Sequence, residues 1–524
     1  MDTIKFVFVF VFVLILKIPM TNAALSEFSD GSNTIVEFNL EENLLNTQMI
    51  KNQENLIRLD IPELGSQQIV GRPELPMINI LLFSELDNTG SDIEIQFSKE
   101  TVKRKGQLSY FKGQKCRCRE IEEYEFNKFD YAAESPRFWI DDFGDYRGKK
   151  VIRLNVLVGM QGSSSFELSK NVSIFIPKHY QSLANYDSQN FQSNPSTLII
   201  GLEEHGQLIT QYQNKLLETR RDVSVEFVKK GENTQKIKSI IKSHFERKKI
   251  NNVILVGNDK IIPTFYVDTK FDTQTPSDYQ YGIMGGESDS IPDVFIARIP
   301  VQSTQELKNV FEKLTSVLNG IHFNKLLGIA SNEGANPSDF EYMRNIINPM
   351  ATAKNATSRF LDQNNLDSNR DTFNSFLENG VDFISYIGHG SGFSWPSFNQ
   401  QYEIEDLELV EHQKKFPMII DIACQNGRFS GEGRIGENFF LGGNDHRLIG
   451  AAIYYGGSVD ISWHPPAVMA TGISRFLSQN KNVSIEDALT YGHFYLMNSN
   501  TPKEDIIDNL EWYHLQGDPG IIIF

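Results

Sequence analysis

The sequence predicts an α/β protein, with a mainly parallel sheet covered by helices on both faces and a β-rich region ahead of it. From residue 197 onward, short apolar runs alternate with segments of helical periodicity. From about residue 34 to residue 180, apolar residues instead recur at every second position, which is typical of antiparallel strands. The polar stretch 181–196 separates the two regions and is predicted to be a linker.

The length and the net charge of the chain limit the classes of protein to which it can belong. The chain has 524 residues and 59.7 kDa, enough for about two to four domains. The net charge of −17, from 50 basic and 67 acidic residues, disfavours nucleic acid and anionic membranes as partners. Of the three cysteines, Cys116 and Cys118 lie in one Cys-Arg-Cys run and Cys424 stands alone, so a disulfide-stapled scaffold is excluded.

The first residues have the pattern of a secretory signal. An apolar run of 11 residues, 6–16, lies between Lys5 and Lys17, and spanning a bilayer takes about 20. Small residues follow, so we place the signal peptide at 1–23, with cleavage after Ala23. An uncleaved membrane anchor is the alternative. We expect a secreted protein without stable membrane insertion, because no later segment is long and apolar enough to span.

In the β-rich region, alternation predicts strands at 34–40, 93–99, 151–159 and 166–176. Nothing here forms a catalytic set. The basic stretch 103–119 is interpreted as a solvated hairpin, with a functional surface as the alternative.

In the second region the periodicity predicts alternating strands and helices, and in such sheets chemistry gathers at the carboxyl ends of the strands. The expected strands are 197–200, 223–228, 252–257, 293–299, 326–330, 381–387, 418–423 and 448–456, and the expected helices 206–220, 235–248, 304–318 and 339–353.

Two of these strands end in reactive side chains. The strand 381–387 is followed by His389 within a glycine-rich turn, and the strand 418–423 by Cys424. A cysteine nucleophile needs a nearby base, and glycine beside the histidine lets backbone N–H groups approach an oxyanion. Either residue alone is more often a buried thiol or a satisfied turn histidine. Together, each at a strand end, they favour a catalytic site.

The chain resembles the gingipain-type cysteine peptidases, family C25, which have a caspase-like fold. The resemblance rests on SYIGHGSGFSW and FPMIIDIACQNG, and covers roughly 197–524. Further matching pieces are SDYQYG (277–282), DVFIARIPV (293–301), ASNEGANPSD (330–339) and HLQGDPG (514–520). The region 24–180, notably GRPELP (71–76), resembles the N-terminal prodomain of that family.

The resemblance implies an organisation and a function. After the signal peptide, 24–180 would be a prodomain, 181–196 a linker and 197–524 the peptidase domain. The protein would be a secreted cysteine endopeptidase made as a zymogen, acting on proteins or peptides, with a basic P1 residue expected and its own prodomain as inhibitor. The alternatives are a sortase-like transpeptidase that uses the same acyl-enzyme and a catalytically inactive secreted binding protein on this fold.

Four residues would carry the reaction by this resemblance. Cys424 would be the nucleophile, His389 the general acid and base, and Glu333 the carboxylate that orients the histidine. The backbone N–H groups of Gly390 and Cys424 would form the oxyanion hole. A surface glutamate near a helix start is the alternative for Glu333.

Two further residues would bind substrate. Asp339 lies where arginine-specific members place the carboxylate at the base of the S1 pocket, and Trp463 resembles the aromatic wall of that pocket. The alternatives are a helix N-cap for Asp339 after Pro337-Ser338 and a core tryptophan. No Lys or Arg lies between Lys178 and Lys215, so an enzyme of basic specificity could not cut itself in the linker.

The resemblance also implies a structural calcium site, whereas no cofactor is expected for catalysis. Its ligands would be the Asp289 and Asp293 carboxylates and the backbone carbonyls of Met284 and Ile291. Asn258 stands where the family has aspartate, which removes a charge. A solvated acidic loop is the alternative.

Overall fold

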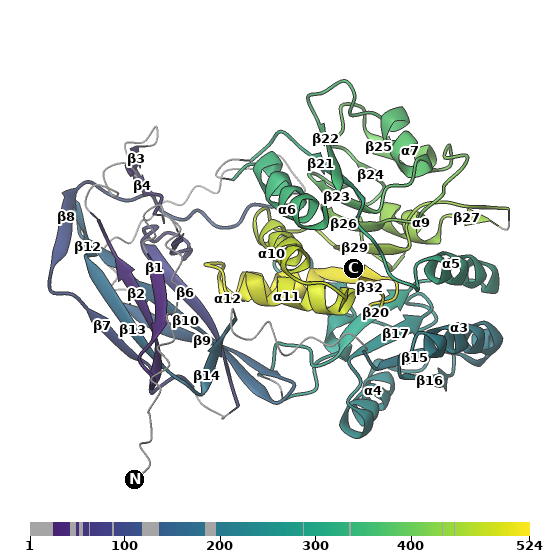
Figure 1. Ribbon diagram of the computed structural model, residues 1–524, viewed down its shortest axis with the longest axis horizontal. Coiled ribbons are helices and arrows are strands. Elements are labelled where there is room, and N and C mark those ends of the chain that lie inside the picture. The colour runs from purple at the N-terminus through teal and green to yellow at the C-terminus, as the bar shows by residue number, and fades with distance from the viewer. Residues whose placement is uncertain are drawn as a thin grey trace, which may run out of the picture.

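The computed structural model (Figure 1) describes residues 25–41, 49–51, 56–61, 63–85, 89–117, 136–183, 195–286, 288–334, 337–431, 433–444 and 446–524. The predicted signal peptide 1–23 and most of the predicted linker lie outside them. Within these ranges, no helix has both the length and the apolar character to cross a membrane.

The N-terminal region folds into small antiparallel sheets, as its alternating pattern predicts. Strand β13 buries every second residue, Val172, Ile174 and Ile176, which is the signature of a sheet with one packed face. The main sheets are β1-β2-β13-β7, β14-β6-β10-β9 with β5 beside β6, and β11-β12-β8. The strands are β1 (Leu25–Ser29), β2 (Asn33–Asn39), β3 (Met49–Lys51), β4 (Ile57–Leu59), β5 (Gly65–Ser66), β6 (Pro76–Ser84), β7 (Glu94–Phe97), β8 (Thr101–Lys105), β9 (Phe138–Tyr146), β10 (Lys149–Leu157), β11 (Gly159–Gln161), β12 (Ser165–Ser169), β13 (Asn171–Pro177) and β14 (Tyr180–Ser182).

The second region is built on a ten-stranded sheet of order β16-β15-β17-β20-β31-β29-β26-β23-β21-β22. All neighbours run parallel except β29 and β31, so the sheet has two halves of opposite direction joined at β31. Its strands are β15 (Thr197–Leu202), β16 (Val223–Val228), β17 (Asn252–Val256), β20 (Phe295–Ile299), β21 (Lys325–Ala330), β22 (Thr357–Asp362), β23 (Phe383–Ile387), β26 (Met418–Ile422), β29 (Ile453–Gly457) and β31 (Tyr513–Gln516).

Helices cover this sheet, and several of them begin at a side-chain cap. Ser303 and Ser338 each form a capping box, with Glu306 and Glu341 respectively. The helices are α3 (Gly206–Glu218), α4 (Thr234–Lys248), α5 (Thr304–Ser316), α6 (Asp339–Lys354), α7 (Arg370–Glu378), α8 (Ile404–Leu407), α9 (Ile435–Leu441), α10 (Pro465–Gln479), α11 (Ile485–Met497) and α12 (Lys503–Trp512). Short 3₁₀ helices and strand pairs complete the fold. The 3₁₀ helices are Glu203–His205 and Tyr279–Tyr281. The strand pairs are β18 (Phe265–Val267) with β19 (Thr275–Ser277), β24 (Ser394–Trp395) with β25 (Tyr402–Glu403), β27 (Gly443–Asn444) with β28 (Arg447–Leu448), and β30 (Val483–Ser484) with β32 (Ile522–Ile523).

This architecture confirms the predicted fold class, including the strands on which His389 and Cys424 were placed. Sequence periodicity missed β22 and β31. Strand β31 is only four residues long and follows α12 without a break, so no turn signal marks it.

The β-rich region docks onto α11 and the loop that follows it, as Figure 1 shows for β6, β9 and β10. The Arg153 guanidinium on β10 donates to the carbonyl oxygens of Met497, Ser499 and Thr501 at 3.2, 2.7 and 2.7 Å. Phe83 and Tyr146 each pack edge-to-face on Phe494 with ring centroids 5.0 Å apart. The two regions therefore share part of one apolar core.

Buried ion pairs stabilise the half of the sheet formed by β16, β15, β17, β20 and β31. Arg298 on β20 makes a bidentate pair with Asp278 at 2.6 and 2.7 Å, and donates to two further carbonyl oxygens at 2.7 and 2.8 Å. Arg221 pairs in the same way with Asp518, at 2.8 Å for both contacts. Such pairs fix geometry because every polar atom removed from water needs a partner.

We predict that Arg298→Met lowers the free energy of unfolding by about 3–5 kcal/mol, because it leaves the Asp278 carboxylate buried and unpaired. Urea denaturation followed by circular dichroism measures the change. The control is Arg370→Met, which removes an exposed pair with Asp371 and should leave the midpoint nearly unchanged. Equal shifts in the two variants would contradict the prediction.

Candidate active site

The two reactive side chains lie at one edge of the sheet. Strands β23 and β26 are parallel neighbours with Ile387 opposite Ile422, so the loops that carry His389 and Cys424 leave the sheet side by side. Gly390 packs directly on the second loop, since a Cβ there would lie only 2.2 Å from the carbonyl oxygen of Cys424. The loops can approach this closely only because residue 390 is glycine.

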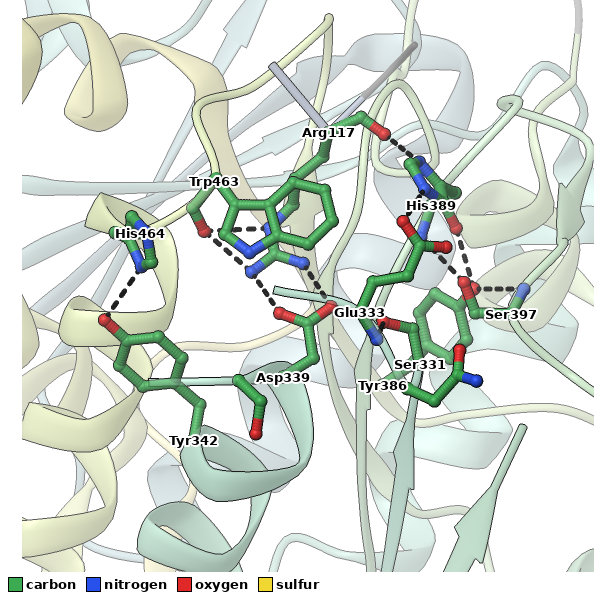
Figure 2. Close-up of polar contacts among 12 residues, drawn as sticks. Arg117, Ser331, Glu333, Asp339, Tyr342, Tyr386, His389, Ser397, Trp463 and His464 are labelled. Carbon is green, nitrogen blue, oxygen red and sulfur yellow. Dashed lines mark hydrogen bonds and ion pairs between the residues drawn. The ribbon is translucent and has the colours of Figure 1, made fainter. Parts of the chain in front are cut away.

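Buried hydroxyls hold the histidine loop in place (Figure 2). The hydroxyl of Tyr386 donates to the carbonyl oxygen of His389 at 2.7 Å, and the His389 N–H donates to Oγ of Ser397 at 3.0 Å. The Ser397 N–H in turn donates to the Tyr386 hydroxyl at 3.0 Å. Sequence reasoning missed both partners, because a serine eight residues after the histidine carries no recognisable signal.

The cysteine loop is held to the histidine loop by Asn426. Its side-chain oxygen accepts from Gly392 N–H, and its amide donates to the carboxylate of Asp421, both at 3.0 Å. Burial raises the pKa of Asp421 to about 6, although its hydrogen bonds with Tyr454, Trp395 and Asn426 oppose the rise. This network couples the two loops through groups that have no access to water.

Glu333 and a backbone carbonyl hold the two sides of the imidazole. Nε2 of His389 lies 3.0 Å from Oε2 of Glu333, and Nδ1 contacts the carbonyl oxygen of Arg117 (Figure 2). Both partners are acceptors, and only a doubly protonated ring donates from both nitrogens. The ring is therefore held between the Glu333 carboxylate and the main-chain carbonyl of the segment that crosses the site.

The thiol of Cys424 is fully buried and is a free cysteine. The N–H of Ile461 donates to its sulfur at 3.4 Å. Burial raises the pKa of this thiol, and neither that hydrogen bond nor the positive charge of Arg117 offsets the effect. In this form the sulfur is held as the thiol, which is the unreactive state.

A segment of the β-rich region lies across the site. Trp463 N–H donates to the Lys115 carbonyl oxygen at 2.7 Å, and Arg117 N–H donates to the Ile461 carbonyl oxygen at 2.9 Å. Between these two hydrogen bonds, the backbones of Cys116 and Ser462 pair as an isolated antiparallel β-bridge. The segment 115–117 thus adds to the cleft wall as a short strand, a common way in which proteins bind extended peptides.

The side chain of Arg117 fills a pocket beside the thiol. Its guanidinium makes two hydrogen bonds of 2.9 Å with the Asp339 carboxylate, and it donates to the Trp463 carbonyl oxygen at 2.9 and 2.7 Å. The indole of Trp463 lies over it, 4.6 Å from the ring centroid. Ser331 Oγ donates to Asp339 at 2.7 Å. Burial works to lower the pKa of Arg117, but the charge and hydrogen bonds of Asp339 outweigh it and the pKa is raised.

The prediction that 103–119 is a solvated hairpin is therefore wrong at its far end. Arg117 has no exposed surface. The charge of the stretch suggested solvation, but a guanidinium can be buried when a carboxylate and carbonyl oxygens take up its donors.

The N-cap of α6 is Ser338, and Asp339 is the first helical residue, fully buried with its carboxylate in the pocket. Trp463 lines the pocket. Glu333 precedes α6 and faces the histidine. Of the six residues expected to act together, His389, Asp339 and Trp463 contact Arg117 directly. Glu333 lies behind the His389 ring, and Gly390 packs against Cys424.

The family model for peptidase family C25 matches residues 192–524. The chain belongs to peptidase family C25. Family membership makes it a cysteine endopeptidase. No curated protein matches the sequence significantly.

Solved structures share the fold of this C25 peptidase. The Arg-specific cysteine proteinase gingipain R (RgpB) is 19% identical over 63% of this chain and 79% of its own, with a TM-score of 0.57. The complex of Porphyromonas gingivalis RgpB pro- and mature domains is also 19% identical over 63% and 79%, with a TM-score of 0.56. A further structure, described as a protease, is 16% identical over 65% and 81%, with a TM-score of 0.53.

The carboxylates expected to bind calcium accept hydrogen bonds from main-chain N–H groups in this arrangement. Asp289 accepts hydrogen bonds from the N–H groups of Asp145, Gly285 and Ile291, and the Arg147 N–H donates to Asp293. Burial raises the pKa of Asp293 to about 6.

Two of the other expected ligands are also hydrogen-bonded. The Met284 carbonyl accepts from the Lys242 ammonium at 3.2 Å, and the Asn258 side-chain oxygen accepts from Lys260 N–H at 3.2 Å. Among the described residues, no group of three or more His, Cys, Asp or Glu side chains could hold a metal ion. Calcium binding by this C25 peptidase stays a prediction.

We predict that Arg117→Ala uncovers the thiol. The substitution leaves Asp339 buried without its partner, which favours release of the segment 115–117. Cys424 should then react with iodoacetamide at least about tenfold faster than in the unmodified chain, because alkylation needs an accessible thiolate.

Mass spectrometry of the Cys424 peptide gives the rate of labelling. The control is Lys103→Ala, an exposed position in the same basic stretch, which should not change it. Equal rates in all three chains would show that Arg117 does not cover the thiol.

Proposed function

We propose that this C25 peptidase is a secreted endopeptidase that cleaves after arginine, and that the full chain is latent because Arg117 occupies its S1 pocket. The observation that carries the proposal is the bidentate contact of the buried Arg117 guanidinium with Asp339. The segment 115–117 supports it further, because its backbone pairs with the cleft wall as an extended substrate would.

The pocket favours arginine over lysine on geometric grounds. Asp339 accepts two parallel hydrogen bonds, and the Trp463 carbonyl oxygen accepts two more from the same planar group. A lysine ammonium is a point charge that cannot present donors to both partners from one plane. The indole face adds a cation–π contact that suits a flat guanidinium.

The reaction follows from where the groups lie. A substrate peptide pairs with Ile461 and Trp463 and places its P1 carbonyl carbon next to Cys424. The thiolate attacks that carbon, and the oxyanion accepts hydrogen bonds from the Gly390 and Cys424 N–H groups.

Histidine moves the protons in this scheme. His389 takes the thiol proton and gives it to the leaving nitrogen, while Glu333 holds the ring and stabilises its charged form. Water then attacks the thioester carbon, returns a proton to His389 and releases a carboxylate together with the thiol.

The contacts of the β-rich region with the peptidase domain give independent support for latency. Its Arg147 donates to Glu486 on α11 at 2.6 Å, and Arg153 binds three carbonyl oxygens of the same domain. Burial raises the pKa of the Cys424 thiol, and the charge of the nearby Arg117 does not offset this rise. The similar complex of RgpB pro- and mature domains supports the assignment of this region as a prodomain that inhibits the peptidase. Extracellular action fits the predicted signal peptide.

A P1 series of otherwise identical peptides tests the specificity. With the activated protein, we expect kcat/KM for P1 arginine to exceed that for P1 lysine by about tenfold to a hundredfold, since one or two charge-assisted hydrogen bonds are lost. Preference for an apolar P1 residue would refute the S1 assignment.

The pocket carboxylate can be tested separately. We predict that Asp339→Asn lowers kcat/KM for arginine substrates by roughly a hundredfold or more, because a buried guanidinium would face a neutral amide. Loss of the pocket carboxylate should lower kcat/KM only for arginine substrates, whereas general damage to the enzyme would lower it for arginine and leucine substrates alike. Steady-state kinetics on both substrates distinguishes the two. Glu341→Gln, an exposed position in the same helical turn, is the matched control and should retain full activity.

Cys424→Ala tests the nucleophile. We predict that proteolysis falls to background while the denaturation midpoint changes little, because the truncation removes one sulfur atom from the core. Retained cleavage would refute the assignment. A transpeptidase reaction would proceed through the same thioester, and product masses with and without an added amine distinguish it from hydrolysis.

A further inference from the structure

The loop that follows β21 reaches both the S1 pocket and the histidine. Ser331 is its first residue, and the Ser331 N–H donates to the carbonyl oxygen of Ile387 at 2.9 Å. Ile387 lies two residues before His389, so this loop leaves the sheet beside the histidine loop. Figure 2 shows Ser331 next to Asp339 and Glu333 next to His389.

The hydroxyl of Ser331 contacts two residues with assigned roles. It donates to the Asp339 carboxylate at 2.7 Å and accepts from the Glu333 N–H at 3.1 Å. A serine hydroxyl has one proton to donate and two lone pairs, so it can form both hydrogen bonds at once. Ser331 is fully buried, and bulk water therefore does not compete for either of them.

A main-chain hydrogen bond completes the same unit. The Asp339 N–H donates to the carbonyl oxygen of Glu333 at 3.0 Å. The main chain of Glu333 is thus held on one side by the Ser331 hydroxyl and on the other by the first residue of α6. The residue that carries the S1 carboxylate and the residue that faces the imidazole belong to one hydrogen-bonded unit.

The aromatic wall of the pocket touches this loop too. Gly334 has a φ of +80°, and a Cβ there would lie 2.8 Å from the indole nitrogen of Trp463. The loop can approach the indole this closely only because residue 334 is glycine. The loop is therefore fixed against both side chains that surround the Arg117 guanidinium.

Glu333 needs this support because its side chain is 44% exposed. An exposed ion pair stabilises little, since holding two side chains in one geometry costs entropy and water screens their charges. The 3.0 Å contact between Glu333 and Nε2 of His389 is thus too weak to fix the loop. The position of the carboxylate depends on the anchors of its main chain.

We propose that Ser331 is a positioning residue, which orients the S1 carboxylate and at the same time holds Glu333 against the histidine. This inference rests on the proposed function, because it needs Asp339 and Glu333 to act as assigned there. A substitution at Ser331 should change both the P1 preference and the rate of the chemical step. Asp339→Asn should change only the preference, since the amide oxygen still accepts from Ser331.

The test compares Ser331→Ala with Ser385→Ala, each made as the full chain and activated in the same way. Ser385 on β23 is equally buried, but its hydroxyl has no hydrogen-bond partner within the described part of the chain, so it is the matched control. Steady-state kinetics on arginine and leucine peptides gives kcat and KM. If the alanine variant folds poorly, Ser331→Cys makes the same comparison, because it keeps the volume and replaces the hydroxyl with a weakly hydrogen-bonding thiol.

Ser331→Ala should lower kcat at least about tenfold on both peptides, because the histidine loses its oriented carboxylate. The ratio of kcat/KM for arginine to that for leucine should also fall at least about threefold, since Asp339 loses a charge-assisted hydrogen bond. Ser385→Ala should change neither quantity.

A double-mutant cycle distinguishes positioning from general damage. In a chain that already carries Glu333→Gln, Ser331→Ala should lower kcat on the leucine peptide by less than about threefold, because the carboxylate that Ser331 positions is gone. Independent damage would instead multiply the two losses.

Failure of this inference and failure of the proposed function give different results. If the unmodified chain hydrolyses the arginine peptide and Ser331→Ala behaves like Ser385→Ala, or if the losses in the double variant multiply, Ser331 does not position Glu333 and the proposed function stands. If the activated unmodified chain never hydrolyses the arginine peptide, the proposed function is wrong and the inference fails with it.

Discussion

The ion pair between Arg117 and Asp339 is the contact on which the rest of this site depends. Both side chains are completely buried, and a charge in such a place is stable only with a partner of good geometry. Asp339 provides two oxygens, and the Trp463 carbonyl and indole complete the cage. The same cage that would select a substrate arginine holds the chain's own segment, so the proposed specificity and the proposed latency draw on one interaction.

The sheet provides the rigid frame that this cage needs. Three of the pieces that mark the family contain partners in buried ion pairs, since Asp278 binds Arg298 and Asp518 binds Arg221. None of these residues touches the catalytic pair in the described contacts. Their role is to fix the central strands, and a fixed sheet edge keeps the two reactive loops in register.

Much of the fold and the reactive pair could be predicted from sequence because both signals are local. Buried parallel strands read as short apolar runs, and His389 and Cys424 each follow such a run directly. Arg117 could not be found in this way. It lies 222 residues from Asp339 in the chain, and a basic, strand-poor stretch resembles a solvated loop until the opposing carboxylate is placed beside it. Ser397 and Asn426 were missed for the same reason, since their contacts arise only when the loops fold.

The pairing of residues 115–117 with Ile461 and Trp463 has a consequence for the proteins this enzyme can digest. Under the proposed function, a substrate would form the same two main-chain hydrogen bonds, so it would have to present an extended strand in which the amide of the arginine and the carbonyl two residues before it are free. In a helix or a sheet interior those groups are already engaged. By this proposal, folded targets would have to open locally before they are cut, and the rate of their digestion would report how often each arginine-bearing segment unfolds rather than how many arginines the target contains.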